Sequence, residues 1–475
     1  MSSLTGHSST ITPGTLASAS ATVQVKTHPV VLVTRTQYVI PTEKYMIPAT
    51  WRRFHLSQLI NKVLALAQPV PFDFIVNGEM LRTSLGDWCL TKGIEEEETL
   101  EIEYIESVLP PERVSSMPHP DWVSSISCEQ KGYLFTGSYD STVRLYNDGQ
   151  QLLHTIGGHS GPISSICLIP PASAPTSSGS EVLVASASYD TTARIVSVPL
   201  SLPNPDDMDP PYPKPLASLC LHTSAVSSIA ANASGRNLLT GGWDTFVGVW
   251  STEIPEADEV DEVVYPTFDA DRKKRRKVSK KDPNGSVRKA PQTVLKSHTN
   301  RVSSVRWSPL DKVEANVAYS CGWDFTVRCW DVEAGVCTST LTAAEKAMLD
   351  LAITSNGKMI ATANGDRTIS LFQVGNPAPP TQLPHTSPVT AISAHPNSPH
   401  HIVSGCMDGT VRIWDLRSTT GAVESFVAVG DQQKAEESKA KKAKSKVLGL
   451  DWTRGNLIGC AGELGVDVWK VNIGN

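Results

Sequence analysis

The sequence lacks the short motifs that mark common classes of enzyme. It contains no G-x-x-x-x-G-K-[ST] phosphate loop, no G-x-G-x-x-G turn, no H-E-x-x-H pair and no G-x-S-x-G elbow. These absences exclude the usual nucleotide-binding, zinc-peptidase and serine-hydrolase signatures. We therefore predict that the chain is not an enzyme and has no cofactor of its own.

Long apolar runs and paired cysteines are also missing. No stretch approaches the roughly 18 uninterrupted apolar residues that a membrane-spanning helix needs. Residues 1–21 are rich in Ser and Thr and have no basic start followed by an apolar stretch, so we expect a disordered tail and no secretory signal. The 9 cysteines show no two-residue spacing, which favours reduced thiols in an intracellular protein. A net charge of -6 argues against general nucleic-acid binding.

What the sequence does contain is an internal repeat. The 32 glycines and 33 prolines suit many short strands joined by turns. Seven times, an acidic residue is followed six positions later, across a β-rich run, by an aromatic or aliphatic residue. The pairs are Asp140 with Tyr146, Asp190 with Val196, Asp244 with Trp250, Asp324 with Trp330, Asp366 with Phe372, Asp408 with Trp414, and Glu463 with Trp469.

A histidine precedes five of these acids by 21 to 31 residues, which leaves room for two short strands between them. A buried histidine that donates to a turn aspartate would satisfy both polar groups, so we predict structural pairs. Five repeated copies favour this interpretation over a hydrolase triad built with Ser138 or Ser188. The expected pairs are His119 with Asp140, His159 with Asp190, His222 with Asp244, His298 with Asp324, and His385 with Asp408.

This spacing resembles the WD-repeat family, in which four-stranded blades close into a propeller. The resemblance predicts a mostly β chain, with a seven-bladed β-propeller over residues 111–475. An insertion is expected at about 251–296, because the acids of the third and fourth units stand 80 residues apart where the next two gaps are 42 each.

Residues 22–110 do not follow the repeat. A β-rich run at 30–34 precedes a helical stripe, and later strands are expected at 72–76, 80–82 and 99–105. The order ββαβββ predicts a ubiquitin-like α+β domain. The apolar positions of the helical stripe are Leu56, Leu59, Ile60, Val63 and Leu64.

Short sequence segments in and after this region carry a closer resemblance to a known family. The segments PVPFDF at 69–74, GEMLRTSL at 78–85 and DWVSS at 121–125 look like a Notchless-type ubiquitin-like domain joined to a propeller. The combination resembles the Ytm-type family of WD-repeat ribosome biogenesis proteins. The resemblance implies a complex with Pescadillo and block-of-proliferation proteins on the large-subunit pre-ribosome, the latter held through the propeller, and a place in rRNA maturation.

The resemblance also implies a docking site through which the protein is removed from the pre-ribosome. In this family the ubiquitin-like domain docks on the AAA ATPase midasin, where an acidic side chain completes a divalent metal site. The matching loop lies between Gly93 and Leu100, and counting from both flanks favours Glu97 as the ligand of a shared Mg²⁺. The alternatives are another glutamate of 95–98, or a solvated acidic loop with no such role.

The expected insertion carries a dense basic run. Its residues are Arg272, Lys273, Lys274, Arg275, Arg276 and Lys277. We interpret them as a nuclear import signal, which predicts location in the nucleus. The family resemblance implies the nucleolus and nucleoplasm. A solubilising loop or contact with rRNA phosphates is the alternative, and a second basic run at 439–446 has the same options.

Aromatic residues stand immediately before the turn acid in the first four repeats. In a propeller such positions ring one face near the central channel, so they form a candidate partner surface. Packing of loops against one another is the competing explanation, and docking near Asp451 and Trp452 is a further option. The candidate residues are Tyr139, Tyr189, Trp243 and Trp323.

Three other functions stay open on the sequence. A ubiquitin-like module beside a propeller would suit a substrate receptor of a ubiquitin ligase, although no terminal di-glycine follows the module. A Notchless-type sibling has the same domain order but eight blades, against seven counted here. An RNA-binding protein without protein partners is disfavoured by the acidic total charge.

Overall fold

The computed structural model describes residues 26–66, 68–95, 97–171, 181–202, 211–260, 285–309, 316–343, 346–376, 378–428 and 445–472. The chain divides into two compact units, one comprising residues 1–77 and 81–105 and the other the remainder. The division at Ile105 falls before the boundary expected at 110, because Val108 is buried in the core of the second unit. Within the described segments, neither helix is both long and apolar enough to cross a membrane.

Among the described residues, the first unit is built on a five-stranded sheet with two helices, although the edge strand at Glu79–Met80 falls in the segment 78–80 that the division gives to the second unit. Its sheet has the order β2-β1-β5-β3-β4, in which β1 pairs antiparallel with β2 and parallel with β5. The parallel pairing of first and last strands is the topology of a ubiquitin-like domain. The elements are β1 (Thr27–Val33), β2 (Lys44–Pro48), α1 (Arg53–Leu64), β3 (Phe72–Val76), β4 (Glu79–Met80), α2 (Leu85–Lys92) and β5 (Leu100–Glu106).

Helix α1 confirms most of the predicted apolar stripe. Leu56 and Ile60 are fully buried, and Leu59 and Leu64 pack at the edge of the same core, whereas Val63 is exposed. Five apolar positions were therefore one too many for a helix that buries a narrow face on the sheet.

Helix α2 was missing from the predicted order. Its first turn is capped by Ser84, whose hydroxyl accepts a hydrogen bond from the Asp87 N–H at 3.2 Å. Its end is set by Gly93, which adopts φ 69° in the left-handed region. A Ser-x-x-Asp start and a terminal glycine were visible signals, but the helix buries only Leu85, Trp88 and Cys89 and is too short for clear periodicity.

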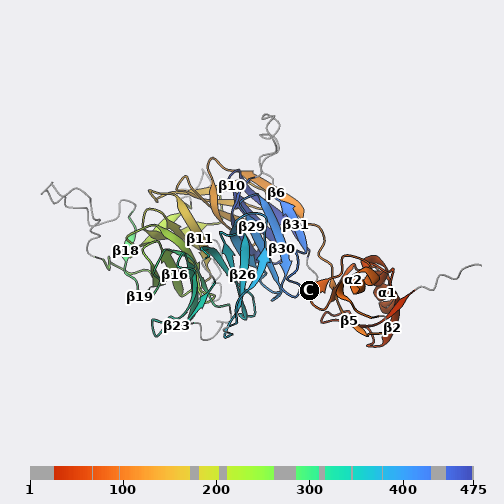
Figure 1. Ribbon diagram of the computed structural model, residues 1–475. Helices are drawn as coiled ribbons and strands as arrows, with labels where there is room; N and C mark the ends of the chain where they lie inside the picture. Colours follow the sequence, from red (N-terminus) through yellow and green to blue (C-terminus); the bar gives the residue numbers. More distant parts are fainter. Residues whose placement is uncertain are drawn as a thin grey trace, which may run out of the picture. The chain divides into compact units, whose positions relative to one another are not determined.

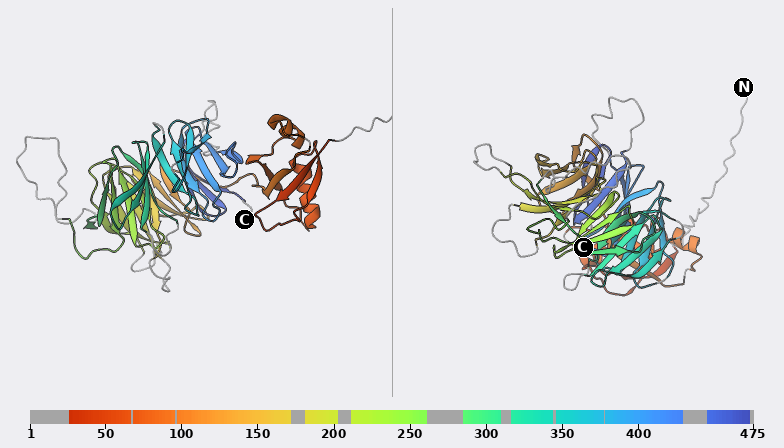
Figure 2. Two further views of the ribbon diagram at one scale, coloured as in Figure 1. Left: turned by 60° about the horizontal axis from the view of Figure 1, so that its bottom comes forward. Right: turned by 90° about the vertical axis from the view of Figure 1, so that its left-hand side faces the viewer.

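In the described part of the second unit, seven sheets are arranged in a ring. The first strand of each sheet lies against the first strand of the next, and β32 lies against β7, so that the ring closes. These inner strands are β7 (Val123–Ser127), β11 (Ile163–Ile169), β15 (Val226–Ala231), β20 (Val302–Trp307), β24 (Met348–Ile353), β28 (Val389–Ala394) and β32 (Val447–Arg454). Figure 1 shows the sheets following one another in sequence order, and Figure 2 shows the propeller from two further sides.

The remaining strands complete each sheet outward in antiparallel order, and the mostly β fold with an amino-terminal ubiquitin-like domain is confirmed. They are β8 (Tyr133–Ser138), β9 (Val143–Asn147) and β10 (Leu152–Ile156); β12 (Glu181–Ser188), β13 (Ala193–Pro199) and β14 (Lys214–Leu219); β16 (Asn237–Gly242), β17 (Phe246–Ser251) and β19 (Thr293–Lys296); β21 (Val317–Gly322), β22 (Thr326–Asp331) and β23 (Val336–Thr342); β25 (Met359–Asn364), β26 (Thr368–Gln373) and β27 (Thr381–Pro384); β29 (His401–Cys406), β30 (Thr410–Asp415) and β31 (Glu424–Val427); and β33 (Leu457–Gly462) with β34 (Gly465–Lys470).

The last sheet is completed by a strand from the start of the propeller. Strand β6 (Glu112–Pro118) pairs antiparallel with β34, with Met117 opposite Val466. Strand β34 is therefore an interior strand of this sheet, and β6 is its outer strand. In Figure 1 the orange β6 lies beside the blue strands of the final sheet. The ring is thus closed by joining two distant parts of the sequence.

Hydroxyl groups of the inner strands link one sheet to the next. Ser124 donates to the Ile163 carbonyl, Ser164 to that of Val226, Ser227 to that of Val302, and Ser303 to that of Met348, each at 2.6 Å. Thr390 donates to the Val447 carbonyl at 2.5 Å. These hydroxyl side chains of the inner strands therefore connect neighbouring sheets by hydrogen bonds.

The insertion is fixed to the propeller at its base. Strand β18 (Val287–Lys289) pairs in parallel with β14 and makes the second sheet five-stranded. The Asp258 carboxylate accepts from the Arg288 N–H, and the Glu259 N–H donates to the Arg288 carbonyl, both at 2.8 Å. The predicted import run at 272–277 lies outside the described residues.

Candidate partner-binding site

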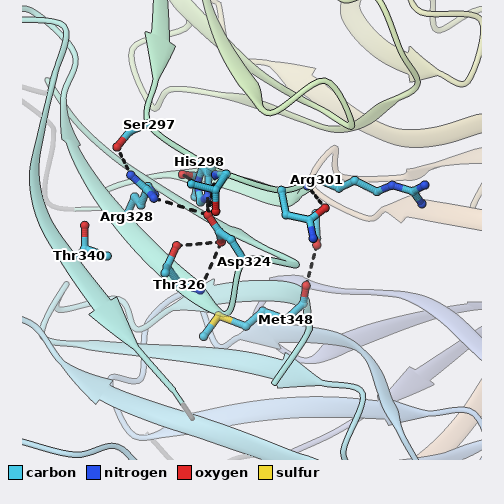
Figure 3. A network of polar contacts seen from close by, with 12 residues as sticks. Ser297, His298, Arg301, Asp324, Thr326, Arg328, Thr340 and Met348 are labelled. Atoms are coloured by element: carbon cyan, nitrogen blue, oxygen red, sulfur yellow. Dashed lines mark hydrogen bonds and ion pairs between the residues drawn. The ribbon is translucent and has the colours of Figure 1, made fainter. Parts of the chain in front are cut away.

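The turn acid of the fourth sheet lies at the centre of a buried polar network (Figure 3). Asp324 accepts hydrogen bonds from His298 Nδ1 at 2.8 Å, from the Thr326 hydroxyl at 2.8 Å and from the Thr299 N–H at 3.2 Å. Arg328 approaches the same carboxylate at 3.5 Å and contacts the Ser297 hydroxyl. Because the carboxylate bonds to both sides of the turn, it holds the loop in one conformation.

The imidazole extends this network into the core. His298 Nε2 lies 2.7 Å from the Ser320 hydroxyl, which also accepts from the indole N–H of the buried Trp330 at 2.7 Å. Burial lowers the pKa of His298, against the opposing effect of Asp324. Burial would raise the pKa of Asp324, but the hydrogen bonds from His298 and Thr326 outweigh it and lower that pKa. A neutral histidine donating to an ionised aspartate is therefore the stable arrangement.

Two further pairs adopt this geometry. His159 Nδ1 lies 2.9 Å from Asp190, and His222 Nδ1 lies 3.0 Å from Asp244. In the third sheet the hydroxyl of Thr240 takes the place of Ser320, and it accepts from Trp250 at 2.9 Å.

The other two expected pairs are wrong in their contacts. His385 Nδ1 faces the Leu383 carbonyl at 3.2 Å, because the Thr386 hydroxyl donates to Asp408 at 2.8 Å in its place. Spacing alone did not reveal which donor reaches the acid.

In the first sheet, likewise, His119 Nδ1 faces the Met117 carbonyl at 3.1 Å. Asp140 forms an ion pair with Arg144 and accepts from Thr142 instead.

The backbone of the residue before the turn acid is bound to the loop that leads into the inner strand of its sheet. The N–H of Tyr139 donates to Trp122, that of Tyr189 to Pro162, and that of Trp243 to Ala225, at 2.8 to 3.0 Å. The residue after the acid has a left-handed backbone, as in Ser141 with φ 67° and Phe325 with φ 64°.

The four predicted aromatic residues form a connected surface together with Trp122. Ring centroids lie 5.9 Å apart for Trp122 and Tyr139, 6.1 Å for Tyr139 and Tyr189, and 5.3 Å for Tyr189 and Trp243. The Arg301 guanidinium lies 4.4 Å from the Trp243 ring and 5.4 Å from the Trp323 ring and so continues the series. We call Trp122, Tyr139, Tyr189, Trp243 and Trp323 the aromatic row.

The residues of the aromatic row are packed against one another and partly exposed. The rings pack against their neighbours, yet Trp122 and Trp323 are 41% exposed and Tyr189 is 36% exposed. A contiguous exposed aromatic surface is unusual for a protein without a partner. The sequence did not mark Trp122 and Arg301 as members of a binding surface, because neither occupies the position before a turn acid. Each lies in a loop that leads into an inner strand.

Asp451 does not face a partner. Its side chain is buried, with 7% of the residue exposed, and it accepts from the Cys128 N–H at 2.5 Å and the Thr453 hydroxyl at 2.9 Å. Trp452 beside it is fully buried. Asp451 therefore joins the last sheet to the first, which corrects the expectation of an outward contact there.

Glu97 lies in the exposed loop between α2 and β5. Glu95 and Glu98 are exposed with it, the Glu98 N–H donates to the Glu95 carbonyl at 3.3 Å, and Glu96 lies outside the described residues. Within the described residues, no group of three His, Cys, Asp or Glu side chains could hold a metal ion. An exposed carboxylate such as Glu97 fits the role of a single oxygen ligand to a metal held mainly by another protein.

Comparison with family models identifies two kinds of module in the chain. Residues 29–89 match the NLE (NUC135) domain. The WD domain, G-beta repeat matches residues 112–147, 150–197, 213–251, 289–331, 335–373 and 379–415.

Several relatives match nearly from end to end, and they share the name Ribosome biogenesis protein YTM1. The protein of Coprinopsis cinerea is 45% identical over 455 residues, which cover 94% of this chain and 95% of the relative. That of Laccaria bicolor is 43% identical over 461 residues, covering 95% and 96%, and that of Kluyveromyces lactis is 33% identical over 417 residues, covering 86% and 88%. The chain thus belongs to the YTM1 family of ribosome biogenesis proteins, a family of non-enzymatic WD-repeat scaffolds.

Proposed function

We propose that this chain is an assembly factor of the large ribosomal subunit, acting in the maturation of its rRNAs in the nucleolus and nucleoplasm. Its relatives carry the name of ribosome biogenesis proteins over both units of the fold. In this role the chain is a scaffold that holds Pescadillo-type and block-of-proliferation-type proteins on the pre-ribosome, and it catalyses nothing itself.

The observation that carries the scaffold role is the exposed aromatic row. It spans the turns of the first four sheets, and aromatic side chains are the residues that dominate binding energy at protein interfaces. We assign it to the block-of-proliferation-type partner. The buried His-Asp networks beneath it hold the turns, so the surface is formed before the partner arrives.

The ubiquitin-like unit provides a separate function in this proposal. Its exposed Glu97 would donate a carboxylate oxygen to a divalent metal in the adhesion domain of midasin, and ATP hydrolysis there would remove the protein from the pre-ribosome. Midasin would supply the other ligands. A carboxylate in a solvent-exposed loop needs no compensating charge in the free protein.

The experiment compares partner binding by full-length variants in which one exposed aromatic residue is replaced. Tyr189→Ala and Trp323→Ala should each weaken binding of the purified block-of-proliferation-type partner by about tenfold or more, since hot-spot truncations cost about 2 kcal/mol. Tyr212→Ala is the matched control, because Tyr212 is 60% exposed but lies outside the row. Equal affinity of all three variants and the unaltered protein would contradict the assignment of the row.

A further inference from the structure

We propose that Arg301 binds a carboxylate. The carboxylate belongs to an acidic side chain on the protein segment that docks along the aromatic row. The proposal rests on the proposed function, because it names the chemistry of the partner at that surface. The guanidinium lies against two indoles, and no Asp or Glu of the described residues forms an ion pair with it.

The two tryptophans hold the guanidinium in place. Its central carbon lies 4.4 Å from the ring centroid of Trp243 and 5.4 Å from that of Trp323. Contacts with two indoles restrict the side-chain rotamers of Arg301 and remove water from part of the cation. The N–H groups at the edge of a stacked guanidinium are left to form hydrogen bonds, and their fork matches a carboxylate.

The nearest acid of the network is already occupied. Asp324 accepts from His298, Thr326 and Thr299, and the cation that approaches it is Arg328. Figure 3 shows the Arg301 side chain leading away from Asp324. Among the described residues, no Asp or Glu forms an ion pair with Arg301.

The other cation of the row is in a different state. Lys446 lies 5.3 Å from the Trp122 ring, but its ammonium also pairs with Glu463 at 2.7 Å. One cation at the end of the row is therefore neutralised within the protein, and the other is left for a partner.

A protein carboxylate fits this surface better than RNA. A nucleic-acid backbone needs several cations in line, whereas the described part of the row offers one free guanidinium. Asp121, which is exposed beside Trp122, and Glu463 would repel further phosphates. The exposed rings of Tyr189 and Trp122 suit apolar residues that flank a single acid in a peptide segment.

The test is a double-mutant cycle between the full-length protein and the full-length block-of-proliferation-type partner. Arg301→Gln should weaken binding by about tenfold, with Arg301→Lys intermediate because an ammonium lacks the planar fork. Lys296→Gln is the matched control, since Lys296 is an exposed cation 5.2 Å from the Phe246 ring on an outer strand. Each exposed acid of the partner is then replaced by its amide in both backgrounds.

The expected result is one partner acid whose replacement weakens binding to the unaltered protein but costs nothing further against Arg301→Gln. If Tyr189→Ala weakens binding while Arg301→Gln does not, the carboxylate proposal is overturned and the row keeps its partner. If no row variant weakens binding, the row assignment and the carboxylate proposal both fail. If Arg301→Gln weakens binding, no acid couples to it and a single-stranded RNA oligomer competes, the ligand is phosphate and the proposal is overturned.

Discussion

Gly449 of β32 faces the backbone of Ser124 of β7 so closely that a Cβ at position 449 would lie 2.6 Å from the Ser124 carbonyl oxygen. The obstacle is backbone and cannot rotate away, so a side chain would push the last sheet off the first. Gly449→Ala should therefore lower the free energy of unfolding by about 1–3 kcal/mol. Gly421→Ala, whose Cβ would meet no atom within 4 Å, is the control in urea unfolding. Equal midpoints for the two variants would show that this junction tolerates expansion.

Asp324→Ala should destabilise the propeller more than the same change at Asp366. The first variant leaves the buried His298 without its acceptor, at a cost of about 1–3 kcal/mol. Asp366 occupies the same turn position, but its partners are Lys346 and Thr368 and its side chain is 35% exposed. Thermal unfolding of both variants measures the difference. A variant of Asp324 that keeps its melting temperature and loses one binding activity would instead make the residue part of a binding site.

Stability should fall as the pH drops from about 6.5 toward 4. Burial lowers the pKa of His401 from an ordinary 6.5 to about 4, although Asp415 opposes the shift. Between these values the unfolded chain binds a proton that the folded chain excludes, so the free energy of unfolding decreases by about 1.4 kcal/mol per pH unit for each such group. His385, whose pKa is also lowered to about 4, adds to the effect. Urea unfolding of His401→Gln should show a shallower pH dependence, and an unchanged slope would rule out His401 as a contributor.

Glu97→Asp should weaken binding to the adhesion domain of midasin, because the carboxylate retreats by about 1.5 Å, one carbon-carbon bond. Glu97→Ala should abolish binding, as should a chelator added to the unaltered protein. Folding should be unaffected, since the loop is exposed. Overproduced Glu97→Ala should enter pre-ribosomes, remain there and inhibit large-subunit assembly. Glu98→Ala serves as the control from the same loop, and strong loss with that variant alone would move the metal ligand to Glu98.

Replacing the six basic residues of 272–277 by alanine should shift a fluorescent fusion to the cytoplasm while its melting temperature stays unchanged. The insertion is attached to the propeller through Asp258, Glu259 and Arg288, and the variant keeps these contacts. Substitution of Lys439, Lys441, Lys442 and Lys444 is the control. Continued nuclear accumulation of the first variant would mean that the protein enters with a partner or through the second basic run.

The sequence predicted the propeller well because the acid and the aromatic residue six positions later serve a repeated local need. Trp250, Trp330 and Trp414 are all fully buried between sheets, and the acids precede them in tight turns. The prediction of the His-Asp pairs failed where several donors compete for the same aspartate. Arg144 at Asp140 and Thr386 at Asp408 replace the histidines that spacing alone favoured.

In the candidate site too, the features tied to the repeat were predicted from the sequence and the others were not. The four aromatic residues before the acids were predicted from their shared position, and the structure brings them together. Arg301 and the burial of Asp451 depend on contacts between different sheets. Such contacts leave no periodic mark in the sequence, so only the folded chain reveals them.

The pairing of β6 with β34 has a consequence for synthesis. Residues 112–118 leave the ribosome long before Gly465, the first residue of β34, and at 5–20 residues per second the delay is roughly 20–70 s. During that time β6 has no partner strand. The ubiquitin-like unit, which precedes it in the chain, has already been synthesised. A factor made to build ribosomes is thus itself exposed to mispairing while it is translated, and slower elongation or a shortage of chaperones should reduce its yield before any of its binding surfaces exist.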